Sequence, residues 1–237
     1  MARGVLITGG GKRIGAAIAF ECAKSGWDIA LHYRSSRKDA EGLADRIEGM
    51  ERSCRLFQAD FGDMAQVMRL IPDVLESMPQ VNVLVNSVSL FRRATMMETT
   101  ESLFDDHFQV NLKTPFFLSQ AFANRVRDGH IVNILDTKVS KHAIRYFAYS
   151  LTKKSLAEFT CMAARELGPA IRVNAVAPGL ILPSAGTSRD AFENMGKKIP
   201  LKQTGNPDDI AQAVLFLLQS RFITGECIFV DGGERLM

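Results

Sequence analysis

Short apolar runs alternate along the chain with longer stretches in which apolar residues recur every three or four positions. Compact runs bounded by turn residues are typical of strands, whereas the longer recurrence is typical of amphipathic helices. The predicted strands are Val5–Thr8, Asp28–Tyr33, Ser53–Ala59, Val81–Val85, Gly129–Leu135, Ile171–Ala175 and Glu226–Val230. The predicted helices are Ile14–Ser25, Lys38–Met50, Met64–Ser77, Ser102–Arg127, Ala148–Leu167 and Pro207–Gln219.

This alternation predicts a single Rossmann-like, doubly wound α/β domain over residues 1–237. Strands separated by helices pair in parallel through crossover connections, so the sequence predicts a seven-stranded parallel sheet flanked by helices. The expected strand order begins 3-2-1-4. One long interruption, residues 179–200, is rich in Gly, Ser and Pro, with a short helix expected near Arg189–Lys197. Long excursions of this kind are often functional, so we expect a substrate lid here.

Composition argues against some kinds of binding partner for this protein. The 237 residues are 46% hydrophobic, and the net charge of +3 is only mildly basic. The chain has no dense Lys/Arg tract, which argues against a nucleic-acid partner. No stretch approaches the roughly 20 apolar residues of a membrane span, and the first apolar run is too short for a signal peptide. We therefore expect a cytoplasmic protein that does not associate with membranes.

The cysteines add no metal or redox motif. Cys22, Cys54, Cys161 and Cys227 are scattered, without the close pairing that structural metal sites and dithiol centres require. We interpret them as packing or surface residues of a reducing compartment. No metal is expected.

A glycine-rich segment, Thr8–Gly15, joins the first predicted strand to the first predicted helix. Glycines allow a tight turn and close approach of the backbone to a pyrophosphate, and the helix N-terminus offers free N–H groups. We expect Gly9, Arg13, Ile14 and Gly15 to bind a dinucleotide. The alternative is an ordinary strand-to-helix turn.

The end of the second strand indicates which dinucleotide binds. Tyr33, Arg34, Ser35 and Ser36 follow in sequence, and no acidic residue stands there to bind ribose hydroxyls. A guanidinium and two hydroxyls suit a 2′-phosphate. The segment therefore favours NADPH over NADH; the alternative is a solvated basic turn.

A candidate proton-transfer group lies on the helix Ala148–Leu167. Tyr149 and Lys153 are spaced i, i+4 and so share one helix face, and Asp136 lies thirteen residues before the tyrosine. The Lys153 ammonium is expected to lower the pKa of Tyr149 by about 1–3 units, making the phenol a usable acid. An ionised Asp136 would repel the oxyanion that forms when a ketone is reduced, so either Asp136 is protonated or the acceptor is not a simple ketone.

These motifs resemble the short-chain dehydrogenase/reductase superfamily over nearly the whole chain. The resemblance implies that Asp60 and Phe61 contact adenine, that Pro178 and Gly179 lie beside the nicotinamide, and that Asn111 bends its helix and holds a water in a proton relay. For Asp60 the alternative is a helix N-cap, and for Asn111 a surface amide. The resemblance also implies a homotetramer.

Within the superfamily, four features resemble pteridine reductases and bacterial dihydromonapterin reductases. They are Arg13 in the glycine-rich turn, the strand end His32–Ser36, Asp136 in place of the usual Ser, and the segment Asn86–Phe91. By this resemblance Asn86, Ser87 and Ser89 bind the cofactor. Arg13, Ser89, Phe91, Asp136 and Tyr149 would hold the substrate, with Phe91 stacking a pterin against the nicotinamide. The alternative for Phe91 is a core aromatic.

The favoured interpretation is an NADPH-dependent reductase of a pterin-like substrate, of the dihydropterin, dihydromonapterin or dihydrofolate type. Tyr149 and Lys153 would supply one proton route, fed by water at Asn111, and Asp136 would supply or orient another proton. The first alternative is a carbonyl reductase of the same superfamily, such as a 3-oxoacyl carrier-protein reductase. The second is a non-catalytic NADP-sensing protein, against which the Tyr149/Lys153 pair argues.

Overall fold

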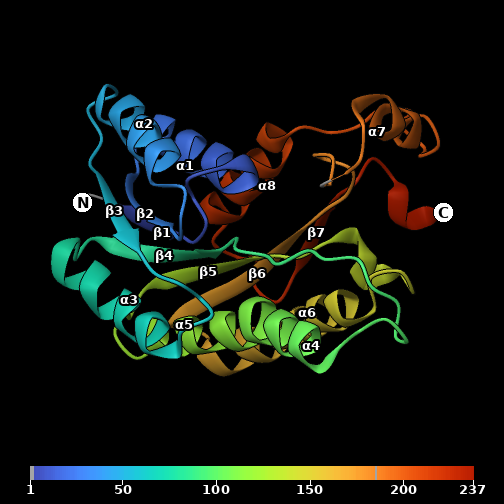
Figure 1. Cartoon of the computed structure of the whole chain (residues 1–237). Helices are drawn as coiled ribbons and strands as arrows, with labels where there is room; N and C mark the ends of the chain where they lie inside the picture. The colour runs from blue at the N-terminus through green and yellow to red at the C-terminus, as the bar shows by residue number, and fades with distance from the viewer. Residues whose placement is uncertain (1–2, 185) are drawn as a thin grey trace.

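The computed structural model describes residues 3–184 and 186–237. Its centre is one sheet of seven parallel strands in the order β3-β2-β1-β4-β5-β6-β7 (Figure 1). The strands are β1 Gly4–Ile7, β2 Asp28–Tyr33, β3 Cys54–Gln58, β4 Val81–Asn86, β5 Gly129–Ile134, β6 Ile171–Pro178 and β7 Cys227–Val230. The predicted fold class and the predicted order of the first four strands are confirmed.

Helices cover both faces of the sheet (Figure 1). Those on one face are α1 Arg13–Lys24, α2 Arg37–Glu48 and α8 Pro207–Gln219, and those on the other are α3 Met64–Ser77, α4 Glu101–Phe108, α5 Thr114–Ala123 and α6 Phe147–Leu167. The shorter elements are a π-helical turn η1 Gln109–Lys113, two 3₁₀ turns η2 Thr137–Ser140 and η3 Glu234–Leu236, and α7 Arg189–Gly196. In the described part of the chain, no helix has the length and apolar character needed to cross a bilayer.

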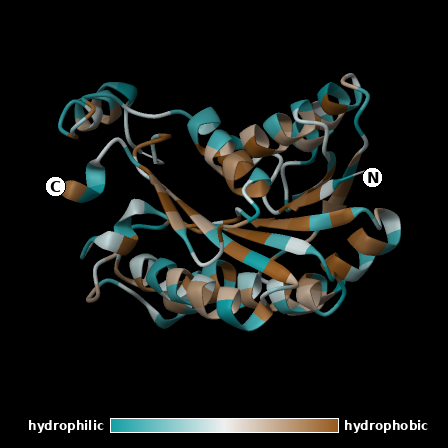
Figure 2. Cartoon of the chain, turned by 180° about the vertical axis from the view of Figure 1, so that it is seen from behind, coloured by the Kyte–Doolittle hydropathy of each residue, from teal (hydrophilic) through white to brown (hydrophobic). Residues whose placement is uncertain are grey.

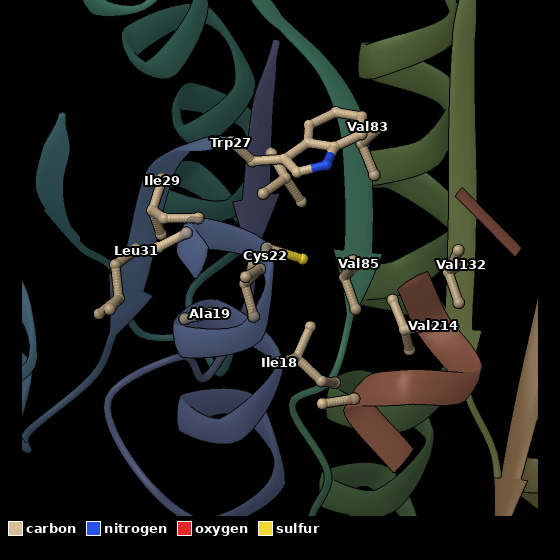
Figure 3. Packing of buried hydrophobic residues seen from close by; sticks show 14 of the residues in the cluster. Ile18, Ala19, Cys22, Trp27, Ile29, Leu31, Val83, Val85, Val132 and Val214 are labelled. Carbon is tan, nitrogen blue, oxygen red and sulfur yellow. The ribbon is translucent and has the colours of Figure 1, made fainter. Parts of the chain in front are cut away.

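Burial of apolar side chains on both faces holds the layers together. The strands are the most continuously hydrophobic part of the ribbon in Figure 2, as expected for a sheet covered on both sides. On the α1/α8 face, Ile18 and Cys22 of α1 and Val214 of α8 pack onto Val85 and neighbouring strand residues (Figure 3). A second cluster fills the opposite face around Leu84 and Phe122. The sheet is thereby a rigid base for the loops at its edge.

One predicted helix differs from the structure. The predicted helix Ser102–Arg127 is not a single α-helix. It begins at Glu101, changes to a π-helical turn at η1, continues as α5 and ends at Ala123. Asn111 lies at the centre of η1 and is fully buried. A π turn inserts an extra residue and redirects the helix, and such turns are frequent at functional sites. The π turn lies at the residue where the sequence predicts a bend.

The topology brings the candidate residues to one edge of the sheet. The chain runs from β1 outward to β2 and β3, then returns to β4 on the other side of β1. In such sheets ligands bind outside the carboxyl ends of the strands, at the point where the order reverses. The loops after β1, β2, β4, β5 and β6 all leave from that edge. The predicted lid, residues 179–200, also begins there and contains α7, while its residue Ala185 lies outside the described residues.

Candidate active site

The glycine-rich turn packs tightly on itself after β1. A Cβ atom at Gly15 would lie 2.3 Å from the carbonyl oxygen of Gly9, a distance that no side chain can tolerate. Glycine at position 15 therefore lets the start of α1 close onto the turn. Ile14 and Gly15 lie in the first turn of α1, whose early N–H groups have no partner within the helix. This arrangement is a ready anion site.

Arg13 starts α1 in an unusual conformation. Its φ is +56°, a region that non-glycine residues seldom adopt. Its guanidinium Nη2 donates a hydrogen bond to the carbonyl oxygen of Pro183, 3.3 Å away. Arg13 therefore connects the glycine-rich turn to the beginning of the lid.

His32, the penultimate residue of β2, is hydrogen-bonded to the same glycine-rich turn. The N–H of Gly9 donates to His32 Nδ1 at 3.0 Å, and His32 Nε2 lies 3.0 Å from the carbonyl oxygen of Ala59. A neutral ring with its proton on Nε2 satisfies both contacts. Burial lowers the pKa of His32 to about 4, so this neutral form holds at neutral pH. The ring also stacks on Phe61, with centroids 4.3 Å apart.

The segment after β2 faces the glycine-rich turn. Tyr33 is buried, whereas Arg34 and Ser35 are exposed and free to meet a ligand. The Ser36 hydroxyl lies 3.0 Å from the position that a Cβ of Gly11 would occupy. The basic segment and the anion-binding turn are therefore adjacent, as the NADPH hypothesis requires.

Asp60 and Phe61 follow β3 and make different contacts. Asp60 Oδ1 accepts from the N–H of Gly62, whereas the cap of α3 is Asp63, which accepts from the N–H of Ala65. The alternative of a helix N-cap for Asp60 is therefore wrong. The Phe61 ring is buried, and the Phe61 carbonyl oxygen accepts from Gln109 at 3.1 Å.

The β4 end is held by hydrogen bonds to neighbouring strands. The Thr8 hydroxyl accepts from the N–H of Ser87 at 2.9 Å, which ties this loop to the end of β1. Asn86 donates to Asn133 on β5 at 2.9 Å. The other amide atom of Asn86, Oδ1, is buried without a hydrogen-bond partner among the described residues. An orphaned acceptor at this edge fits a ligand that brings a donor.

Asp136 and Tyr149 meet directly. The Tyr149 hydroxyl donates to Asp136 Oδ2 at 2.8 Å, and the Asp136 side chain also caps η2 by accepting from the N–H of Lys138 at 2.8 Å. The Lys138 ammonium lies 3.2 Å from Asp136 Oδ1. The structure thus joins the two predicted residues and adds a cation that sequence reasoning missed.

The predicted direction of the Tyr149 pKa is wrong. Burial, reinforced by the adjacent Asp136 carboxylate, raises the pKa of Tyr149 well above its usual value of 10. Lys153 does not offset this rise, because its ammonium lies 6.0 Å from the centre of the Tyr149 ring and donates to the carbonyl oxygen of Ile134 at 2.8 Å. Burial also lowers the pKa of Lys153 to about 8.

Aromatic rings form one wall beside the tyrosine. Phe91 stacks on Tyr146 with centroids 4.5 Å apart and meets the Tyr149 ring edge-on at 4.7 Å. Phe91 is 37% exposed, so it is not the core aromatic of the alternative reading. The Ser89 side chain lowers the pKa of Tyr149, an effect smaller than those of burial and Asp136. Phe91 and Ser89 therefore lie where a substrate ring would contact the proton-transfer group.

The Asn111 side chain forms hydrogen bonds with the loop that follows β4. Its Oδ1 accepts from the N–H of Leu90 at 2.7 Å, and its Nδ2 donates to the Leu90 carbonyl oxygen at 2.9 Å. The alternative of a surface amide is wrong, because the residue is fully buried. The side-chain amide clamps the loop that carries Ser89 and Phe91.

The C-terminal turn closes the site beside β6. A Cβ at Gly179 would lie 2.7 Å from Cα of Asp231, so the chain after Pro178 can pass the C-terminal segment only with glycine there. Asp231 accepts from the hydroxyl of Thr137 at 3.0 Å. Glu234 lies next to Gly179, with Oε1 3.6 Å from Lys141 and Oε2 buried without a partner in the described chain.

Two charged residues at this site, Lys138 and Glu234, were not predicted from the sequence. Lys138 follows Asp136 by two positions, but neither periodicity nor a known motif marks it. Glu234 is far from the other site residues in sequence and reaches them only through the fold.

Comparison with known proteins identifies the family. Residues 10–234 match a family model described as enoyl-(acyl carrier protein) reductase. The chain is 33% identical over 241 residues to the 3-oxoacyl-[acyl-carrier-protein] reductase FabG of Staphylococcus aureus, covering 98% of each protein.

Solved structures agree on the fold. The FolM alternative dihydrofolate reductase 1 from Brucella canis, complexed with NADP, superposes with a TM-score of 0.95 at 35% identity, covering 99% of this chain and 94% of that one. A blue fluorescent protein from a metagenomic library, in complex with NADPH, superposes with a TM-score of 0.91 at 32% identity, covering 98% and 97%. The chain therefore belongs to the short-chain dehydrogenase/reductase superfamily of oxidoreductases.

Proposed function

We propose that this protein is an NADPH-dependent reductase that acts on a C=N bond of a dihydropterin-type substrate, of the dihydropterin, dihydromonapterin or dihydrofolate class. One observation carries the proposal: the Tyr149 hydroxyl donates to a carboxylate, Asp136, at 2.8 Å. The solved relatives complexed with NADP that are named alternative dihydrofolate reductases support it.

The carboxylate discriminates between substrates by its hydrogen-bonding capacity. A ketone oxygen is only an acceptor, and a carboxylate has no hydrogen to donate to it. A pterin ring instead presents N–H and amino groups, which a carboxylate accepts. Asp136 thus favours a nitrogen heterocycle.

The residues at the carboxyl edge of the sheet fit NADPH. The cradle at Gly9 and Gly15 suits the pyrophosphate, and Arg34 with Ser35 and Ser36 suits the 2′-phosphate. The orphaned Asn86 Oδ1 and the buried Lys153 ammonium lie deeper in the same edge. Ser87, Asp60, Phe61 and Gly179 border it. When bound, the nicotinamide supplies the hydride.

The side chains around the substrate ring would then position it and transfer protons to it. Phe91 offers an aromatic face for a planar ring, and Arg13, tied to the lid at Pro183, closes the opposite end. Tyr149 would donate a proton to the ring nitrogen next to the carbon that accepts the hydride, with Lys153 in the same proton route. Asn111 keeps the loop of Ser89 in place.

The second candidate is a carbonyl reductase acting on a 3-oxoacyl thioester. The observation that favours it is the 33% identity to FabG over almost the full length of both proteins. A panel of NADPH oxidation assays separates the two functions, with dihydropterin, dihydromonapterin, dihydrofolate, acetoacetyl thioester and simple ketones as acceptors. Reduction of the thioester with no turnover of any pterin would reject the primary proposal.

We also propose that the chain forms a homotetramer, with the α4–α6 face in one interface. Phe104, Phe116 and Met162 on this face are 40%, 42% and 63% exposed. Contiguous apolar surface on one face is typical of a subunit contact. Size-exclusion chromatography with light scattering measures the molecular mass of the assembly. The mass of a monomer would contradict the proposed tetramer.

A further inference from the structure

Lys138 occupies a position that the proposed reaction does not yet use. It lies in η2, directly after β5, and its ammonium is 3.2 Å from Asp136 Oδ1 and 3.4 Å from Asp136 Oδ2. Its own N–H also donates to Asp136 Oδ1 at 2.8 Å. One residue therefore holds the carboxylate with both its main chain and its side chain.

The Lys138 side chain is held from the other side by the aromatic wall. Its ammonium lies 5.3 Å from the centre of the Phe91 ring and 5.5 Å from that of Tyr146. Cations at such distances are attracted to ring faces. The Lys138 side chain is only 22% exposed and that of Asp136 only 16%, so water screens the ion pair weakly. Asp136 Oδ2 remains available to the Tyr149 hydroxyl.

Other charged and titratable groups surround the pair from each neighbouring element. Lys153, Tyr146 and Tyr149 come from α6 and its N-terminal boundary, and the His107 ring of α4 lies 6.1 Å from that of Tyr149. Glu234 of η3 approaches but pairs with Lys141, whose ammonium is 3.6 Å from its Oε1. Among the described residues, Lys138 is the cation in ion-pair contact with Asp136.

We propose that Lys138 is a positioning residue for the reaction. Through its ion pair it holds the Asp136 carboxylate in the orientation that accepts the Tyr149 hydroxyl and compensates the charge of that carboxylate, so its loss should lower kcat more than it changes KM. The inference rests on the proposed function only in that turnover is the readout.

The charge argument gives the direction of the effect. Without Lys138, the Asp136 carboxylate is left in a poorly screened site beside Tyr149, with no cation at contact distance. The carboxylate also loses the side-chain contact that fixes its orientation. The Tyr149 hydroxyl is then held less well for proton transfer, so turnover falls while substrate binding changes little.

The test is kcat and KM for Lys138→Met, Lys138→Gln and Lys138→Arg. The matched control is Arg145→Met, which removes an exposed cation from the loop between η2 and α6 that does not contact Asp136. Both constants are measured with the acceptor that the unmodified enzyme reduces best, pterin or carbonyl. If pterins fail with the unmodified protein, the proposed function fails, but the role of Lys138 is still measured on the carbonyl substrate.

We expect Lys138→Met and Lys138→Gln to lower kcat about tenfold or more while KM changes little. Lys138→Arg should restore kcat, because it keeps the cation, and NADPH affinity should stay unchanged in all variants. Arg145→Met should behave as the unmodified enzyme. The proposal is overturned if both neutral variants keep the original kcat, if only KM changes, or if Arg145→Met produces the same loss.

Discussion

The hydroxyl of Tyr149 lies 2.8 Å from Oδ2 of Asp136, a residue thirteen positions earlier in the chain. A carboxylate has no hydrogen to donate to a ketone oxygen, whereas it accepts hydrogen bonds from the N–H and amino groups of a pterin. This contact is the physical basis for expecting a nitrogen heterocycle as substrate, and it can be removed by one substitution.

Asp136→Ser should depress pterin reduction about 10- to 100-fold while leaving ketone reduction unchanged or improved, because a serine hydroxyl both accepts and donates. Steady-state kcat/KM for one pterin and one ketone measures the change in preference. Asp136→Asn keeps the shape but removes the carboxylate, and should also depress pterin reduction. Full pterin activity in Asp136→Ser would reduce Asp136 to a cap for η2.

Tyr149→Phe should abolish most turnover and leave NADPH affinity nearly intact, since the ring stays and only the hydroxyl is lost. Removal of a general acid typically lowers the rate about 10²- to 10⁴-fold. Assay of kcat together with NADPH binding by fluorescence separates the two effects. Tyr146→Phe is the matched control, because its ring stacks on Phe91 but its hydroxyl does not contact Asp136. Equal losses in both variants would mean that Tyr149 is not the proton donor.

Much of this site follows from the sequence because its motifs lie at strand ends. Once β1, β2, β4, β5 and β6 are recognised as parallel, their following loops must converge, and the glycine-rich turn, Asp136 and Pro178 are placed by topology alone. The i, i+4 spacing of Tyr149 and Lys153 places both on one face of α6.

What sequence could not predict depends on side-chain orientation and on distant contacts. The Lys153 ammonium binds the Ile134 carbonyl oxygen, so its effect on Tyr149 is outweighed by burial and by Asp136. Glu234 reaches the site only because Gly179 allows the C-terminal turn to pack against β6. Neither fact is encoded in a local pattern.

Arg34→Asp should weaken NADPH binding far more than NADH binding, since the change removes a cation and adds an anion next to the 2′-phosphate. One charge-assisted contact of about 1.5–3 kcal/mol corresponds to roughly 10- to 150-fold in affinity. Titration of both cofactors into both proteins measures the ratio. Arg37→Asp makes the same charge change on a guanidinium already paired with Glu41 at 2.8 Å, and should have a smaller effect. Equal NADPH and NADH affinities in the unmodified protein would contradict the assignment.

The buried His32 should make stability fall in mild acid. Its pKa is lowered from 6.5 to about 4 by burial, so between these values the unfolded chain binds the proton more readily than the folded one. The contribution of His32 to stability is therefore complete above pH 6.5 and is lost as the pH falls toward 4.

We expect the free energy of unfolding to drop by roughly 2–3 kcal/mol on this account between pH 7.5 and pH 4.5. Urea unfolding at these two pH values measures the drop in the unmodified protein and in His32→Asn, which should be less stable at pH 7.5 and lose less on acidification. Some pH dependence remains in the variant, because the pKa of the buried His130 is also lowered, to about 3. His142→Asn, at an exposed histidine, is the matched control. If His32→Asn and the unmodified protein lose the same free energy on acidification, His32 does not enter the folded state as the neutral bridge between Gly9 and Ala59.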